Sequence, residues 1–134
     1  MTATARHVID DTERIRPHVR LCHHILREGL ASRFTAVEFN AAPGATPSAR
    51  AQSDGAWKDF MAFPPPVYGM LVEHLKDMAG FAPEAREAVG TILVRVAGRD
   101  ASLTLRVRRN EQGSDEGTVA FPSTPVGKAE QPGR

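Results

Sequence analysis

Residues 64–81 read Pro64-Pro65-Pro66-Val67-Tyr68-Gly69-Met70-Leu71-Val72-Glu73-His74-Leu75-Lys76-Asp77-Met78-Ala79-Gly80-Phe81. Proline is tolerated in the first turn of a helix but not inside one, so the prolines predict a helix start. Apolar residues then recur with helical spacing on one stripe. The stripe consists of Val67, Met70, Leu71, Leu75 and Met78. We expect Glu73, Lys76 and Asp77 to lie off this stripe, and Gly80 to end the helix.

Sequence on both sides of this helix alternates between apolar and polar residues, which predicts strands. We expect strands at 35–40, 57–63, 92–96, 103–107 and 118–121, with a weaker candidate at 49–53. Val37 and Phe39 should face the core. Asp54-Gly55 predicts a tight hairpin, because primed turns need positive φ at their central residues. Trp57, Asp59 and Met61 should share one face of their strand, opposite Phe60.

A first helix is predicted from Pro17 to about Ser32, although Gly29 weakens it by about 1 kcal/mol relative to alanine. His23 and His24 are adjacent, so they diverge by about 100° on a helix and are expected to be partly exposed. Residues 82–88 form a connector, with Pro83 at the start of one further helical turn. Residues 110–117 are expected to be a loop.

These elements predict a small α+β domain: a mainly antiparallel sheet of about five to six strands covered by two helices. The 134 residues are enough for one domain with a real core. We expect a flexible leader over 1–14, the domain over 15–121, and a disordered tail over 122–134, which is rich in proline and glycine.

The composition is that of an ordinary globular protein. The net charge of +1 does not favour nucleic-acid binding. One cysteine fits a reducing compartment, and the N-terminus lacks the apolar segment of a secretory signal. No apolar run approaches the roughly 20 residues of a membrane-spanning helix. We therefore expect a cytoplasmic location.

No catalytic constellation is evident, and we expect neither an enzyme nor a bound metal or cofactor. Val126-Gly127-Lys128 lacks the earlier glycine, the following Ser or Thr and the helix of a phosphate loop. Cys22 has histidines beside it in sequence, but a nucleophile needs a base oriented across space. A buried helix cysteine is the better interpretation of Cys22, and a turn residue that of Asp54.

Arginines are the main candidate surface. Arg95, Arg106 and Arg108 are predicted to lie on one side of a hairpin, with Arg99 at its tip and Arg109 near its end. Together with Arg50, such a surface can bind phosphates or an acidic protein. The alternative is a solvated sheet face without a ligand.

The order of motifs over roughly residues 19–121 resembles the domain that precedes the ATPase core in type II secretion and type IV pilus assembly ATPases. The motifs are 25–28 before 36–41, the hairpin segment Arg50–Gly55, the pair Pro65-Pro66, the helix end Met78-Ala79-Gly80-Phe81, and 90–99. The resemblance implies a PAS-like α+β module whose arginines reach a nucleotide held by an adjoining ATPase domain.

This sequence departs from the family pattern where that pattern contacts nucleotide. Ala36, Glu38 and Asn40 replace the acidic and histidine positions of the first strand. Gln52 replaces an arginine, although Arg50 is kept, and 89–91 lacks another arginine. Walker motifs are absent from this sequence. The resemblance therefore implies the fold and an ancestry, and argues against the ATPase activity.

Two functions follow as expectations. One is a non-catalytic protein-interaction or regulatory domain whose partner is a secretion or type IV pilus ATPase, or a second copy of the chain. The other is a module that binds a nucleotide or another phosphate-bearing ligand through Arg50, Arg95, Arg99, Arg106 and Arg108.

Overall fold

The computed structural model describes residues 6–9, 16–41, 44–82, 84–96, 98–111 and 113–122, and for 6–9 it describes the backbone alone. The elements along the chain are β1 (Arg6–Ile9), α1 (Pro17–Ala31), β2 (Ala36–Asn40), β3 (Ser48–Ser53), β4 (Ala56–Ala62), α2 (Pro65–Met78), β5 (Glu87–Val96), β6 (Arg99–Arg109) and β7 (Asp115–Ala120). The expected leader at 1–5 and 10–14, the turn proline Pro83 and the tail beyond residue 122, with its Val126-Gly127-Lys128, lie outside the described residues.

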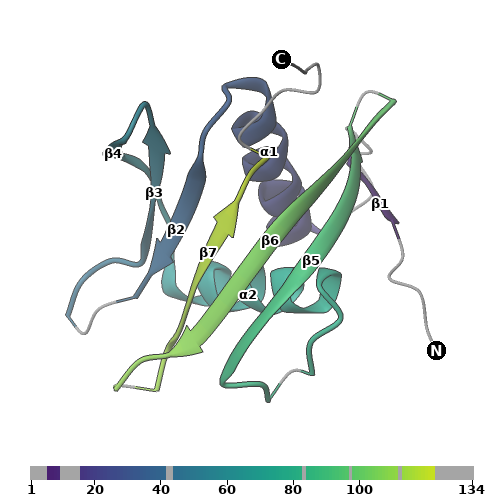
Figure 1. The fold of residues 1–134 in the computed structure, drawn as a ribbon. Helices are drawn as coiled ribbons and strands as arrows, with labels where there is room; N and C mark the ends of the chain where they lie inside the picture. The colour runs from purple at the N-terminus through teal and green to yellow at the C-terminus, as the bar shows by residue number, and fades with distance from the viewer. Residues whose placement is uncertain are drawn as a thin grey trace.

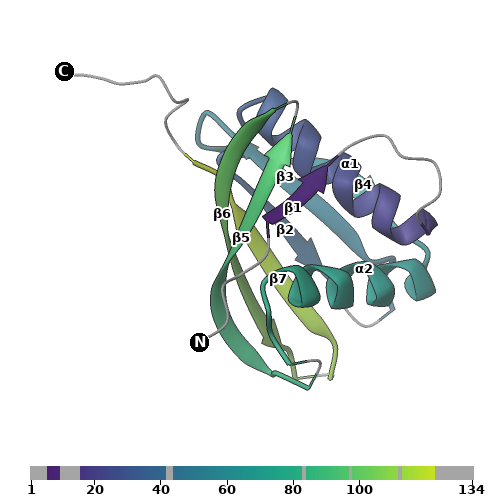
Figure 2. The ribbon, with the colours of Figure 1, turned by 90° about the vertical axis from the view of Figure 1, so that its right-hand side faces the viewer.

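The strands form one sheet in the order β1-β5-β6-β7-β2-β3-β4. Every pair from β5 to β4 is antiparallel. Both helices lie on the same side of the sheet, as Figure 2 shows, and Figure 1 looks onto the opposite side. The predicted α+β class, with a mainly antiparallel sheet covered by two helices, is confirmed.

The strand β1 corrects the predicted leader. Residues 6–9 pair in parallel with β5, from Arg6 beside Leu93 to Ile9 beside Val96. A parallel partner is far away in sequence, and a four-residue strand carries little alternation, so local pattern did not reveal it. The sheet therefore has a seventh strand, at the edge next to β5 (Figure 1).

The helix α2 begins and ends where the sequence predicts. Its first residues are prolines, and Gly80 has a φ of +80° just beyond its end. The buried face is rotated from the predicted stripe, because it includes Tyr68, Val72 and Lys76. Met70, expected in the core, is 43% exposed, whereas Lys76, expected outside, is 1% exposed.

The helix α1 packs through Cys22, Ile25, Leu26 and Gly29. At Gly29 the ring of Phe121, which follows β7, lies against the helix backbone. Glycine weakens a helix, but here it provides the space for an aromatic ring. The predicted exposure of the two histidines is confirmed, since His24 is exposed and His23 is half-buried.

The hairpin between β3 and β4 turns at Asp54 and Gly55, whose φ angles of +54° and +80° are those of a type I′ turn. A register shift in this hairpin corrects the predicted faces of β4. Met61 pairs with buried Ala49, whereas Asp59 pairs with Arg50 on the other face. The bulge therefore separates Met61 from Trp57 and Asp59.

The hairpin of β5 and β6 is the longest pair in the sheet, with ten paired positions. Both strands extend further than the alternation predicted, and β7 begins at Asp115 inside the expected loop. Its inward residues are fully buried: Ile92, Val94, Leu103, Leu105 and Val107. Val37, Phe39 and Val119 continue the same core across β2 and β7.

Candidate functional site: the open face of the sheet

The side of the sheet that faces away from α1 and α2 is here called the open face (Figures 1 and 2). Residues paired across neighbouring strands lie on the same face, and successive residues alternate. The register therefore assigns side chains to each face. Buried Val37, Leu105 and Val119 pair across β2, β7 and β6 on the helix side.

One row of residues crosses six strands on the open face. From β4 to β5 it runs Asp59, Arg50, Glu38, Thr118, Arg106 and Val89. Neighbouring strands lie about 4.8 Å apart, so Arg50 and Arg106 are about 14 Å apart at the backbone. They share the row but do not converge on one small ligand.

Arg50 and Glu38 form an ion pair in this row. Nη2 of Arg50 donates to Oε1 of Glu38 at 2.8 Å, and Asn40 donates to the same oxygen at 3.2 Å. The hydrogen bond from Arg50 is the main reason that the pKa of Glu38 lies below its ordinary value. The guanidinium of Arg50 also lies 5.4 Å from the ring centroid of Trp57, a cation–π distance.

Two further arginines of the open face are paired with carboxylates. Nε of Arg95 donates to Asp100 at 2.8 Å, and Arg108 lies 3.5 Å from Glu116. Both pairs join directly opposed residues of neighbouring strands. These contacts act as cross-strand pairs, and they reduce the positive charge that the face presents.

The five arginines predicted as a ligand surface do not gather in one place. Four of them lie on the open face: Arg50, Arg95, Arg106 and Arg108. Arg95 is six residues further along β5 than Val89, the residue opposite Arg106. It is therefore about 20 Å from Arg106 along the strand direction. Arg99 alternates with Asp100 and so belongs to the helix side, next to the turn. The structure thus brings together Arg106 and Arg108, with Arg50 across the sheet.

A polar network that the sequence did not reveal lies on the helix side. Nζ of buried Lys76 donates to the carbonyl oxygen of Ala85 at 3.0 Å and to Oδ2 of Asp115 at 3.2 Å. Asp115 also accepts from Nε of Arg109 at 3.0 Å, and its backbone oxygen accepts from the hydroxyl of Tyr68. The spacing of Tyr68, Val72 and Lys76 at i, i+4 and i+8 was the available signal. These hydrogen bonds connect α2 to β7, and through Asp115 to Arg109 of β6.

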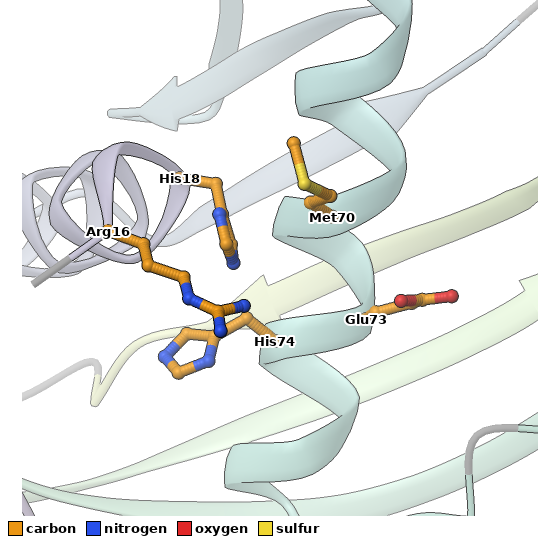
Figure 3. A pocket seen from close by; sticks show the side chains of 5 residues that line it. All are labelled: Arg16, His18, Met70, Glu73 and His74. Atoms are coloured by element: carbon orange, nitrogen blue, oxygen red, sulfur yellow. The ribbon is translucent and has the colours of Figure 1, made fainter.

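A shallow pocket of about 400 Å³ lies between α1 and α2. It is lined by Arg16, His18, Met70, Glu73 and His74. Figure 3 shows Glu73 pointing away from the side of α2 on which Arg16, His18 and His74 gather. The ring centroids of His18 and His74 are 6.3 Å apart. In the part of the chain that the structure describes, no three His, Cys, Asp or Glu side chains are arranged to hold a metal ion.

Cys22 is buried on α1, as predicted. Burial raises the pKa of its thiol to about 12, so the nucleophilic thiolate is strongly disfavoured.

No helix among the described residues is both long enough and apolar enough to cross a membrane.

Comparison with known proteins adds no relative on which to base an assignment: no protein-family model matches the chain, and no curated protein matches it.

Proposed function

We propose that this domain is a non-catalytic protein-interaction module that binds a partner protein on the open face of its sheet. One observation carries the proposal. Both helices cover the same side, so the described elements leave the other side of the sheet, with its six antiparallel strands, in contact with solvent. Of the three large apolar side chains exposed among the described residues, Trp57 (38%) and Val89 (53%) lie on that face.

The charge pattern of the open face favours a protein partner over a phosphate ligand. The six antiparallel strands place four arginines there, and five carboxylates: Glu38, Asp59, Glu87, Asp100 and Glu116. A phosphate-binding surface needs a local excess of positive charge. Alternating charges with apolar residues at the margins are instead typical of a surface that meets another protein.

The choice of partner follows from the resemblance. The helix, strand, hairpin, proline-initiated helix and arginine-bearing hairpin occur in the order that the pre-ATPase domain of secretion and type IV pilus ATPases implies. Positions that are implied to contact nucleotide in that family carry other residues in this sequence. This supports a module that binds its partner without contacting the nucleotide that the partner holds. We therefore propose as partner an ATPase of this class, or a second copy of the chain.

The test uses the sole tryptophan and two site-specific photo-crosslinkers. One crosslinker replaces Gln52, on the open face of β3, and the matched control replaces Glu73, exposed on α2. The probes are a purified type IV pilus assembly ATPase core and the chain itself. We expect crosslinks from position 52 alone, together with a saturable change in Trp57 fluorescence.

Crosslinking from position 73 alone would place the interface on the helices and overturn the proposal. So would the absence of any complex with either probe, measured by native mass spectrometry. A third arm titrates ATP and cyclic dinucleotides by calorimetry. Saturable nucleotide binding that Arg50→Gln and Arg106→Gln abolish would instead establish the ligand-binding function.

A further inference from the structure

Arg106 differs from the other arginines of the open face. Arg50, Arg95 and Arg108 each lie within ion-pair distance of a carboxylate. Within the part of the chain that the structure describes, Arg106 has no such carboxylate, and its side chain is exposed near the centre of the sheet. Its guanidinium therefore has N–H donors available for a ligand.

Two carboxylates near Arg106, Glu116 and Glu38, are engaged by other donors, and a third, Glu87, which is diagonal to it on β5, forms no ion pair with it. Glu116, diagonal to Arg106 on β7, is contacted by Arg108 and by Nδ2 of Asn110 at 3.3 Å. Glu38, two strands away, is held by Arg50. Among the residues that the structure describes, the charge of Arg106 is therefore not neutralised by an ion pair.

Threonines surround Arg106 on the same face. Thr118 is directly opposite on β7, and Thr104 precedes it by two residues on β6. Thr91 pairs with Thr104 on β5, next to Val89. Directly opposed side chains lie about 5 Å apart, and diagonal ones about 7–8 Å apart. Arg106 thus shares this part of the open face with hydroxyl groups that can donate to an anion and with the apolar side chain of Val89.

We infer that Arg106, with Thr104 and Thr118, donates hydrogen bonds to the carboxylate of an Asp or Glu side chain from the docked partner protein, and that Val89 contacts an apolar residue beside it. This inference rests on the proposed function and specifies the chemistry of the partner at one position. A carboxylate matches the single guanidinium in charge and in fork geometry. A phosphate dianion carries one more negative charge than this guanidinium neutralises, and the next arginine, Arg108, is paired with Glu116.

The test observes the Arg Nε–Hε and backbone amide resonances of the full chain during titration. The probe is a capped peptide of alternating Glu and Val, and its control is the same peptide with Gln in place of Glu. Inorganic phosphate is a third arm. We expect the Glu peptide to shift Arg106 and Thr118 saturably at millimolar concentration. Arg106→Gln should weaken this binding at least about tenfold. Arg99→Gln, on the same strand but the other face, should leave it unchanged.

Equal binding of the Glu and Gln peptides, stronger binding of phosphate, or unchanged binding by Arg106→Gln would each overturn the inference. The proposed function is judged separately by crosslinking from position 52. If those crosslinks persist undiminished in Arg106→Gln, the open face still binds a protein and only the inferred carboxylate contact fails. If the Glu peptide binds at Arg106 but neither protein probe crosslinks, the proposed function alone fails.

Discussion

The ring of Phe121 lies so close to Gly29 that a Cβ at residue 29 would overlap with Cζ of the ring. Phe121 is buried, and its backbone N–H donates to the carbonyl of Thr35. Both contacts restrict movement of the ring away from Gly29. This contact joins α1 to the strand end at β7. It explains why a helix with a strong apolar stripe carries a glycine in its last turns.

Two helix glycines should therefore respond oppositely to alanine. Gly29→Ala must displace the ring, and we expect a loss of about 1–3 kcal/mol in the free energy of unfolding, as for other overpacked cores. Gly69→Ala in α2 has nothing within 4 Å of the added Cβ, so we expect a gain of about 1 kcal/mol from helix propensity. Chemical denaturation measures both. Equal stabilisation by the two substitutions would contradict the contact with Phe121.

The carboxylate of Asp115 bridges Lys76 and Arg109, and its loss should be costly. Asp115→Asn removes the negative charge beside the buried ammonium of Lys76, and we expect a loss of about 3 kcal/mol in unfolding free energy. Lys76→Met should cost less, because Asp115 keeps Arg109.

The control for this pair is Asp77→Asn, at an exposed position of α2, with an expected change within about 0.5 kcal/mol. The double variant of Lys76→Met and Asp115→Asn should be more stable than Asp115→Asn alone. Additive losses in a double-mutant cycle by urea denaturation would show that the two groups do not interact.

Arg50 should determine the titration of Glu38. Its hydrogen bond holds the pKa of Glu38 below the ordinary 4.5, so this pair stabilises the fold above that pH. The contribution is lost as pH falls through the lowered pKa. We expect Arg50→Met to raise the pKa of Glu38 in a carbon-detected NMR titration and to cost about 0.5 kcal/mol at neutral pH, typical of exposed pairs. Arg99→Met, remote from Glu38, should leave this pKa unchanged.

The thiol of Cys22 should be inert in the native state. Burial raises its pKa from 9.0 to about 12, so the thiol form stabilises the fold below pH 9 and that contribution is lost as pH rises further. At pH 9 we expect labelling by a disulfide reagent to follow global unfolding and to accelerate with urea. Glu73→Cys in a Cys22→Ala background provides an exposed control. Rapid labelling of Cys22 without denaturant would contradict its burial.

Local pattern was a good guide to individual elements. The prolines at 64–66 and Gly80 delimited α2, and Asp54-Gly55 identified the hairpin, because these residues constrain their own φ angles. Alternation identified the inward residues of β2, β5 and β6, since a strand has two faces. The helical spacing of apolar residues predicted the wrong exposure for Lys76 and Met70, because their burial depends on which side of α2 packs against Asp115 and the sheet.

The sequence by itself determined the helix limits, the tight turn, the buried face of the main strands and the positions of the arginines. Tertiary structure alone decided that β1 joins the sheet, that both helices cover one side, and which arginines are paired. The physical reason is the separation along the chain over which each kind of interaction acts. Turn and helix preferences act between residues a few positions apart, whereas parallel pairing, the burial of Lys76 against Asp115 and the isolation of Arg106 depend on groups brought together from distant parts of the chain.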